Sequence, residues 1–355
     1  MAVEVNLSPE TRQVLEENHL SPLWELEENE FGTEREDLEP DVWEWGNIKE
    51  AIDLIERDVP IKDLPPGFRR RVTVPVNPKY PGSISHTIYV GVQTVSPGET
   101  APSHRHGANA LRFTIDGHEE MKTVVGGEEF PMKDNDLITT PQWEWHDHTN
   151  DSDENVAWLD VLDLPLVFNS LNVGNVFEEH DDERQNVDKP QGYYESQFGT
   201  LRSTNASNGD IPGPFEGERE PTPPYRFKWT DCYETLEYAA ENNEDAHDPY
   251  DGVSMDYVNP ATGEKPLFPT FGVRAQMLDG STEAHKHNST EIYYVIEGEG
   301  ATRAGDETLD WSERDIFVVP PNTFHNHEAD DEAVLLAFTD RPILESINFY
   351  YETSE

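Results

Sequence analysis

The chain has 355 residues, and its 73 acidic side chains against 25 basic ones give a formal net charge of −48. So negative a chain is excluded as a general nucleic-acid binder, which needs positive potential to displace counterions, and is unsuited to anionic membranes. The acids are spread along the whole chain, whereas an acidic interaction tail is a block of like charge. We therefore expect a hydrated surface adapted to concentrated salt, and hence a halophilic source.

Cysteine content and hydropathy limit the class of protein further. The single cysteine, Cys232, has no second cysteine for an internal disulfide or a thiolate metal cluster. The first residues lack the basic and apolar segments of a secretory signal, and no apolar run approaches the roughly 18 residues of a membrane span. We expect a cytoplasmic protein with no membrane segment.

The N-terminal part of the chain predicts helix. Residues 1–70 are acidic with interspersed aromatic residues, and we expect them to form an N-terminal helical arm. Apolar residues recur near helical period between Trp43 and Ile55, including Ile48 and Ile52. That spacing predicts an amphipathic helix.

The rest of the chain alternates β-rich blocks with connecting segments. Residues 71–168 consist of short β-rich runs separated by Gly, Pro and Asn, a pattern typical of a β-sandwich or small barrel. Residues 169–265 predict a linker that contains one helix, with Asp231 as its N-cap. The β pattern returns in residues 266–342, and residues 343–355 form a C-terminal tail.

The two β-rich blocks carry the same motif. The first reads G-E-T-A-P-S-H-R-H and then D-L-I-T-T-P-Q-W-E-W-H-D-H; the second reads G-S-T-E-A-H-K-H and then D-I-F-V-V-P-P-N-T-F-H-N-H. Equivalent histidines, His104 and His285, are 181 residues apart. Solenoid repeats extend only to about 50 residues, so this period indicates a duplicated domain.

Each copy supplies three histidines with metal-ligand spacing. Residues i and i+2 of a strand point to the same face, so H-x-H directs two imidazoles at one point. For a single histidine an ordinary hydrogen-bonded role is the default, but the repeated spacing favours a metal site in at least one copy. The candidate ligands are His104, His106 and His146 in the first copy and His285, His287 and His325 in the second.

The copies differ at one position. Glu291 follows His287 by four residues and completes a four-ligand set, whereas the equivalent residue after His106 is Ala110. Three neutral imidazoles on one face of a metal leave about three coordination positions open. The first copy could therefore accept both a chelating substrate and a second small molecule, and the second copy is a second candidate metal site.

These motifs resemble the metal-binding signature of the cupins, and the chain resembles a bicupin, an all-β fold of two double-stranded β-helix (jelly-roll) barrels. Four segments are similar to parts of the gentisate 1,2-dioxygenases: A-P-S-H-R-H-G-A-N-A-L-R-F, P-Q-W-E-W-H-D-H, V-A-W-L-D-V-L-D-L-P-L-V and D-P-Y-D-G-V-S-M-D-Y-V-N-P-A-T-G. The resemblance extends from residue 21, in S-P-L-W-E-L, to about residue 340. It implies a homotetrameric non-haem Fe(II) enzyme that uses O2 to open the ring of an aromatic acid, with gentisate giving maleylpyruvate.

The resemblance also implies a substrate pocket beside the first metal site. Arg112 would pair with the substrate carboxylate in bidentate fashion; the alternative is a surface charge on an edge strand. Gln93 and Tyr89 match pocket positions of the family and share one face of a strand. Arg70 is a further candidate, for which a salt-bridged surface is an equal alternative.

Two more residues are candidates for catalytic roles. His148, two residues after His146, could move a proton or bind the substrate, and Asp160 could orient it or a ligand histidine. Salicylate or 1-hydroxy-2-naphthoate cleavage would need the same residues and a different pocket. A metal-binding bicupin without oxygenase activity, in storage or sensing, is the alternative from another class. The choice of iron rests on the resemblance, because affinity order alone does not favour it.

Overall fold

A computed structural model describes residue 9 and residues 37–64, 69–80, 82–171, 177–199 and 222–354. The chain divides into two units, Met1–Asp37 and Leu38–Glu355, and nearly all described residues belong to the second. The S-P-L-W-E-L segment and much of the expected arm lie outside the described residues. No helix within the described ranges is long and apolar enough to cross a membrane.

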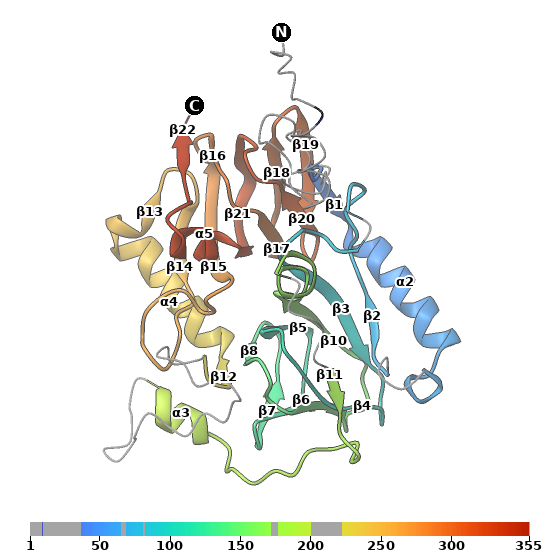
Figure 1. Ribbon diagram of the computed structural model, residues 1–355. Coiled ribbons are helices and arrows are strands. Elements are labelled where there is room, and N and C mark those ends of the chain that lie inside the picture. The colour runs from blue at the N-terminus through green and yellow to red at the C-terminus, as the bar shows by residue number, and fades with distance from the viewer. Residues whose placement is uncertain are drawn as a thin grey trace. The chain divides into compact units, whose positions relative to one another are not determined.

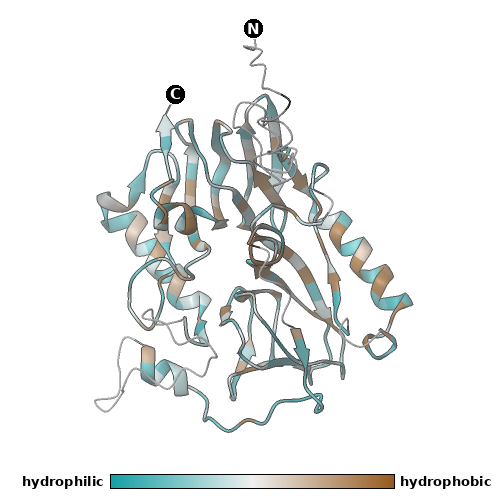
Figure 2. Ribbon diagram, viewed as in Figure 1, coloured by the Kyte–Doolittle hydropathy of each residue, from teal (hydrophilic) through white to brown (hydrophobic). Residues whose placement is uncertain are grey.

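The amphipathic helix is present as α2, Trp45–Asp58, which buries Ile48 and Ile52. Its apolar and polar residues alternate along the ribbon in Figure 2. The helix begins later than its apolar pattern indicates, because Trp43 belongs to strand β1 (Asp41–Trp43), which pairs with β20 (Ile316–Val319) of the second copy. The backbone N–H of Trp45 donates to Asp315 Oδ1 at 2.7 Å, so the second copy also fixes the start of the helix.

The first copy is built from two antiparallel sheets (Figure 1). One has the order β12-β8-β5-β10-β3-β2, with bounds Tyr225–Phe227, Leu137–Thr140, Ala110–Asp116, Val156–Leu162, Tyr89–Val95 and Arg71–Thr73. The other has the order β11-β4-β9-β6-β7, with bounds Phe177–Glu179, Thr100–His106, His146–Asn150, His118–Val125 and Glu128–Met132. The short β-rich runs of the sequence thus form a two-layered barrel.

The second copy forms a single connected sheet because one long strand, β21 (His325–Thr339), belongs to both of its layers. Its first half pairs with β16 and β18, and its second half with β15 and β17. The other strands are β13 His247–Asp248, β14 Gly252–Asp256, β15 Gly272–Ser281, β16 His285–His287, β17 Glu291–Glu297, β18 Glu299–Ala304, β19 Glu307–Ser312 and β22 Glu352–Ser354.

The segment between the copies is more structured than a simple linker. It supplies β11 and β12 to the sheets of the first copy and β13 and β14 to the sheet of the second. Its main helix is α4, Trp229–Asn242, but the N-cap is Lys228, so the assignment of Asp231 as N-cap was wrong. The backbone N–H of Trp229 instead donates to Asp136 Oδ1 of the first barrel at 2.9 Å. Shorter helices are η3 Ile61–Asp63, η4 Leu166–Ser170, α3 Tyr193–Phe198, η5 Glu244–Ala246 and α5 Arg341–Ser346.

The central strands of the first copy are buried on both faces. Outward-facing side chains such as Phe113 and Leu159 belong to the same hydrophobic cluster as Val273, Tyr294 and Leu336 of the second copy. The rings of Phe113 and Tyr294 lie 5.6 Å apart. Because side chains alternate along a strand, the neighbouring residues of the same strands point into the first barrel, where the candidate site lies.

Candidate metal centre and substrate pocket

The three histidines of the first copy converge inside its barrel. His104 and His106 lie on β4, and His146 lies opposite His104 on β9. They are 3%, 5% and 0% exposed, respectively. Their candidate ligand atoms all lie within 4.8 Å of one another. The strand pairing thus brings together residues that are some 40 positions apart in sequence.

The hydrogen bonds of these histidines leave one nitrogen of each ring for a metal. Each Nδ1 lies 2.8 Å from a backbone carbonyl oxygen, of Pro102 for His104, Ala108 for His106 and Glu144 for His146. A carbonyl can only accept, so each Nδ1 carries the proton and each Nε2 keeps its lone pair. Among the described residues His146 Nε2 is buried with no hydrogen-bond partner. An orphaned buried acceptor beside the Nε2 atoms of two other imidazoles fits a metal ion.

The electrostatics of the triad also suit metal binding. Burial lowers the pKa of His104 and of His146 well below the usual value, and burial with the nearby Arg112 charge lowers the pKa of His106 to about 3. The three imidazoles are therefore neutral near pH 7, and a metal need not displace protons from them.

Ala110 is the reason that the first triad lacks the fourth ligand that Glu291 offers in the second copy. Ala110 begins β5 and pairs with Leu162, just as Glu291 begins β17 and pairs with Thr339. Ala110 is 0% exposed and packs with Leu162. An apolar methyl group therefore occupies the place where the second copy has a carboxylate, and within the described residues the first triad offers nitrogen ligands alone.

The candidate residues on β3, β5 and β10, which are Tyr89, Gln93, Arg112 and Asp160, line the same interior face of the six-stranded sheet. Asp160 on β10 lies opposite Arg112 on β5 and Gly91 on β3, and Gln93 and Tyr89 are two residues either side of Gly91. Arg112 Nε lies 3.4 Å from Asp160 Oδ1. Since Arg112 is 2% exposed on a strand between two others, the surface-charge alternative for it is wrong.

Two arginines of the pocket share one buried carboxylate. Arg70 and Arg112 both interact with the buried Asp160, and burial lowers the pKa of each arginine while Asp160 raises it. Glu179 also attracts Arg70, but it lies 3.6 Å from Arg69 as well. Two guanidinium groups thus share the Asp160 carboxylate, an arrangement that suits an organic anion.

His148 and Gln93 present unused polar atoms to the barrel interior. Among the described side chains, both ring nitrogens of His148 and the amide nitrogen of Gln93 are buried without a hydrogen-bond partner. The His148 ring centre lies 5.9 Å from that of His146. Burial lowers the pKa of His148 well below its usual range, so its imidazole is neutral and can both donate and accept.

The structure adds three residues that sequence reasoning missed. Trp158 Nε1 donates to Asp160 Oδ1 at 3.0 Å, and the Trp158 ring lies 4.9 Å from His148; strand alternation from Asp160 could have found it. A Cβ on Gly91 would lie 2.7 Å from Tyr89 Oη, so glycine there keeps room for the tyrosine. Phe177 stacks on His104 with ring centres 5.6 Å apart, but it lies in the segment expected to be a linker, where no pattern indicated it.

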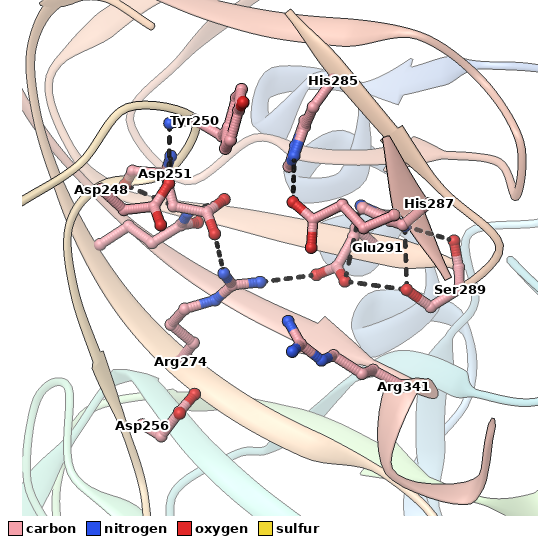
Figure 3. Close-up of polar contacts among 12 residues, drawn as sticks. Asp248, Tyr250, Asp251, Asp256, Arg274, His285, His287, Ser289, Glu291 and Arg341 are labelled. Atoms are coloured by element: carbon pink, nitrogen blue, oxygen red, sulfur yellow. Dashed lines mark hydrogen bonds and ion pairs between the residues drawn. The ribbon is translucent and has the colours of Figure 1, made fainter. Parts of the chain in front are cut away.

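The second triad is assembled in the same way. His285 on β16 lies opposite His325 on β21, and their Nε2 atoms are 3.0 Å apart. Two nitrogens each about 2.1 Å from a metal, at right angles, would be separated by about 3.0 Å. Glu291 Oε1 lies 3.9 Å from His287 Nε2, while its other oxygen lies 3.3 Å from Arg274 (Figure 3). The three histidines therefore form the compact set, and Glu291 lies beside one of them and is also held by Arg274.

Comparisons with known proteins agree with this geometry. A family model described as a cupin domain matches residues 91–162 and 276–339. A gentisate 1,2-dioxygenase of Haloferax is 63% identical over 349 residues, which cover 98% of this chain and 97% of that protein. A 1-hydroxy-2-naphthoate 1,2-dioxygenase of Nocardioides is 35% identical, covering 96% of this chain and 86% of that protein.

The solved structures agree as well. A point mutant of the salicylate 1,2-dioxygenase of Pseudoaminobacter salicylatoxidans, in complex with gentisate, superposes with a TM-score of 0.83 at 28% identity. The match covers 100% of this chain and 97% of that one. The expected all-β bicupin fold is confirmed. The chain belongs to the gentisate 1,2-dioxygenase family of bicupin ring-cleaving dioxygenases.

Proposed function

We propose that this protein is an Fe(II)-dependent dioxygenase that converts gentisate and O2 to maleylpyruvate in aromatic acid catabolism. The observation that carries the proposal is a buried triad of neutral imidazoles, joined by no acidic ligand in the part of the chain that the structure describes, beside a buried Arg112–Asp160 pair. The 63% identical gentisate 1,2-dioxygenase of Haloferax supports gentisate as the substrate. A purely storage role would not need the open coordination side next to Ala110.

His104, His106 and His146 would hold the metal through their Nε2 atoms. Iron(II) there would supply electrons for O2 reduction and positions for the substrate's oxygen atoms. Phe177, stacked on His104, would limit the movement of that ring. The carbonyl oxygens that accept from the three Nδ1 atoms fix the direction of each imidazole before a metal arrives.

The remaining pocket residues would bind and orient the aromatic acid. Arg112, held by Asp160 and by Thr140 Oγ1, would pair with the substrate carboxylate, and Arg70 would add a second positive charge. Burial raises the pKa of Tyr89, so its hydroxyl stays protonated and can donate a hydrogen bond. Gln93 would donate another.

His148 would handle the proton of the substrate hydroxyl. Its two ring nitrogens have no partner among the described residues, and its imidazole is neutral. It could therefore accept a hydrogen bond from the phenolic hydroxyl and relay its proton without keeping the charge, because the lowered pKa disfavours the imidazolium. Trp158, packed against His148 and bonded to Asp160, would keep both side chains in place.

We infer that the second triad, with Glu291, binds a divalent metal in a structural role. The C-terminal strand β22 pairs with β16 over the site, and Glu352 Oε1 lies 2.8 Å from His285 Nδ1. The Tyr250 ring stacks on His285 with centres 4.7 Å apart, and Figure 3 shows it on the side opposite Glu291. These neighbours surround the second triad, and Glu291 offers it a fourth ligand that Ala110 cannot supply in the first copy.

Oxygen uptake tests the proposed activity. Protein loaded with Fe(II) under high salt would be given gentisate, salicylate and 1-hydroxy-2-naphthoate in turn. Consumption of O2 with gentisate, and formation of a ring-opened product, is the expected result. Cleavage of 1-hydroxy-2-naphthoate is the second candidate activity, and the similarity to the 35% identical Nocardioides enzyme supports it. Uptake with none of the three would refute the oxygenase proposal and leave a metal-binding bicupin.

We further propose that the protein works as a homotetramer in the cytoplasm of a halophile. The net charge of −48 and the Haloferax relative support the halophilic source. Tyr238, Ile347 and Phe349 are 68%, 64% and 65% exposed, and subunit contacts could cover them. Sedimentation analysis at molar KCl would give the subunit number; a monomer would refute the assembly.

A further inference from the structure

One peptide group lies between a metal-ligand histidine and a buried carboxylate. His106 Nδ1 donates to the carbonyl oxygen of Ala108 at 2.8 Å. The N–H of the same peptide group, that of Asn109, donates to Asp163 Oδ1 at 2.9 Å. The C=O and N–H of a trans peptide point in opposite directions, so the imidazole and the carboxylate lie at its two ends. Asp163 is 1% exposed.

The other oxygen of Asp163 is bonded to the second copy. Asp163 Oδ2 accepts from Asn109 Nδ2 at 2.9 Å and from Thr270 Oγ1 at 2.6 Å. Thr270 lies two residues before β15, the first long strand of the second copy. A continuous chain of hydrogen bonds therefore runs from the second copy to a ligand of the first metal site.

The second copy has a corresponding series of hydrogen bonds, which runs from one of its metal-ligand histidines to a threonine of the first copy. His287 Nδ1 donates to the Ser289 carbonyl at 3.0 Å and also lies 2.9 Å from Ser289 Oγ, and the N–H of Thr290 donates to Asp340 Oδ1 at 2.8 Å. Asp340 Oδ2 accepts from Thr87 Oγ1 at 2.7 Å. Thr87 lies two residues before β3 of the first copy. His287 and Ser289 are seen together in Figure 3.

We propose that Asp163 and Asp340 are positioning residues, each of which orients one metal-ligand histidine of its own copy and is itself held by a threonine of the other copy. A carboxylate at the N–H end polarises the peptide and makes its carbonyl oxygen a stronger acceptor. The bond to Nδ1–H then strengthens, which fixes the ring and raises the basicity of Nε2 toward a metal. This inference rests on the proposed function in that both triads bind metal.

The proposal makes a specific prediction, because each threonine should affect the metal site of the other copy. Thr270 belongs to the second copy in sequence, yet its loss should weaken metal binding at the first site. Thr87 belongs to the first copy, yet its loss should weaken the second site. Because each threonine contacts the other copy directly, a serine variant is needed to separate the hydrogen bond of the hydroxyl from simple packing.

Site-resolved metal release tests this pattern. Thr270→Val and Thr87→Val remove the hydroxyl with little change in shape, and Asp163 Oδ2 keeps its bond to Asn109. Each would be combined with His285→Ala, to follow the first site alone, or with His104→Ala, to follow the second. Release of Co(II) to a chelator would be measured anaerobically at high salt, with melting temperatures as a check on folding.

We expect each threonine variant to change metal release from the site of the other copy. Thr270→Val should speed release from the first site and not the second, and Thr87→Val the reverse. Thr270→Ser, which restores the hydroxyl, should return release to the parent rate. Asp163→Asn, which removes the carboxylate charge, should weaken the first site by about ten-fold or more, as outer partners of metal ligands typically do.

Other patterns would overturn the proposal. Equal loss at both sites, loss only in the residue's own copy, or a serine variant as weak as the valine one would assign the threonines to general packing. Failure of the proposed function is a separate outcome, because metal release does not depend on turnover of gentisate. If the second copy binds no metal, the proposed role of that site fails, and the Thr270 and Asp163 variants alone decide the inference.

Discussion

The role of Arg112 is open to a quantitative test, and its contacts determine the informative variant. Arg112→Ala removes the proposed partner of the substrate carboxylate. It also removes the guanidinium that lies 3.4 Å from Asp160. Asp160 is only 6% exposed, and it would keep Trp158 Nε1 as a hydrogen-bond donor. The variant would therefore change two properties at once, substrate affinity and stability.

The two effects have different magnitudes and different readouts. Loss of a hydrogen bond to a charged group costs about 1.5–3 kcal/mol, which corresponds to a rise in KM for gentisate of about ten-fold to over a hundred-fold. Removal of one member of a buried ion pair costs roughly 3–5 kcal/mol of folding stability, and the remaining attraction between Arg70 and Asp160 should reduce that cost. In Arg112→Ala/Asp160→Asn the charge of Asp160 is also removed, so stability should largely return while KM stays high.

Initial rates of O2 uptake against gentisate concentration, iron content and melting temperature would be measured for both variants in molar KCl. Arg57→Ala is the control, because that side chain is 67% exposed on α2 and pairs with its neighbour Asp58. It should leave KM unchanged. An unaltered KM in a folded, iron-replete double variant would refute the reasoning and move the carboxylate site elsewhere, with Arg70 as the next candidate.

Three further predictions concern salt and the two triads. Because the net charge is −48, the fold or assembly should be lost below a few hundred mM salt, where screening of the acidic side chains is weak. A melting temperature that does not change between about 0.1 and 3 M KCl would contradict this prediction. His104→Ala should abolish ring cleavage and lower the amount of bound iron. His285→Ala should remove any second metal and retain at least part of the activity. The opposite pattern of turnover would place ring cleavage in the second copy. Ala110→Glu should place a carboxylate where Glu291 lies in the second copy, so iron should be retained and ring cleavage should fall sharply. If that glutamate is instead unpaired in the core, iron content will be unchanged and the melting temperature will drop by the equivalent of several kcal/mol; wild-type turnover in a stable, iron-replete variant would refute the open-site argument.

The sequence by itself determined the features that depend on local periodicity. Side chains alternate along a strand, so H-x-H is enough to predict that His104 and His106 share a face, and the repeated spacing to His146 predicts their convergence. The contrast between Ala110 and Glu291 is likewise a matter of spacing. The amphipathic pattern of α2 predicted a buried face, although the neighbouring Trp43 joined a strand because β20 offered it a pairing edge.

Only the tertiary structure decided the contacts between distant segments. Thr270 and Asp163 are 107 residues apart, and Thr87 and Asp340 are 253 apart. Glu352 reaches His285 only because β22 pairs with β16. Such contacts depend on strand register and on how the two barrels pack face to face. Neither is encoded in a local pattern, because both are set by the burial of side chains that many parts of the chain contribute together.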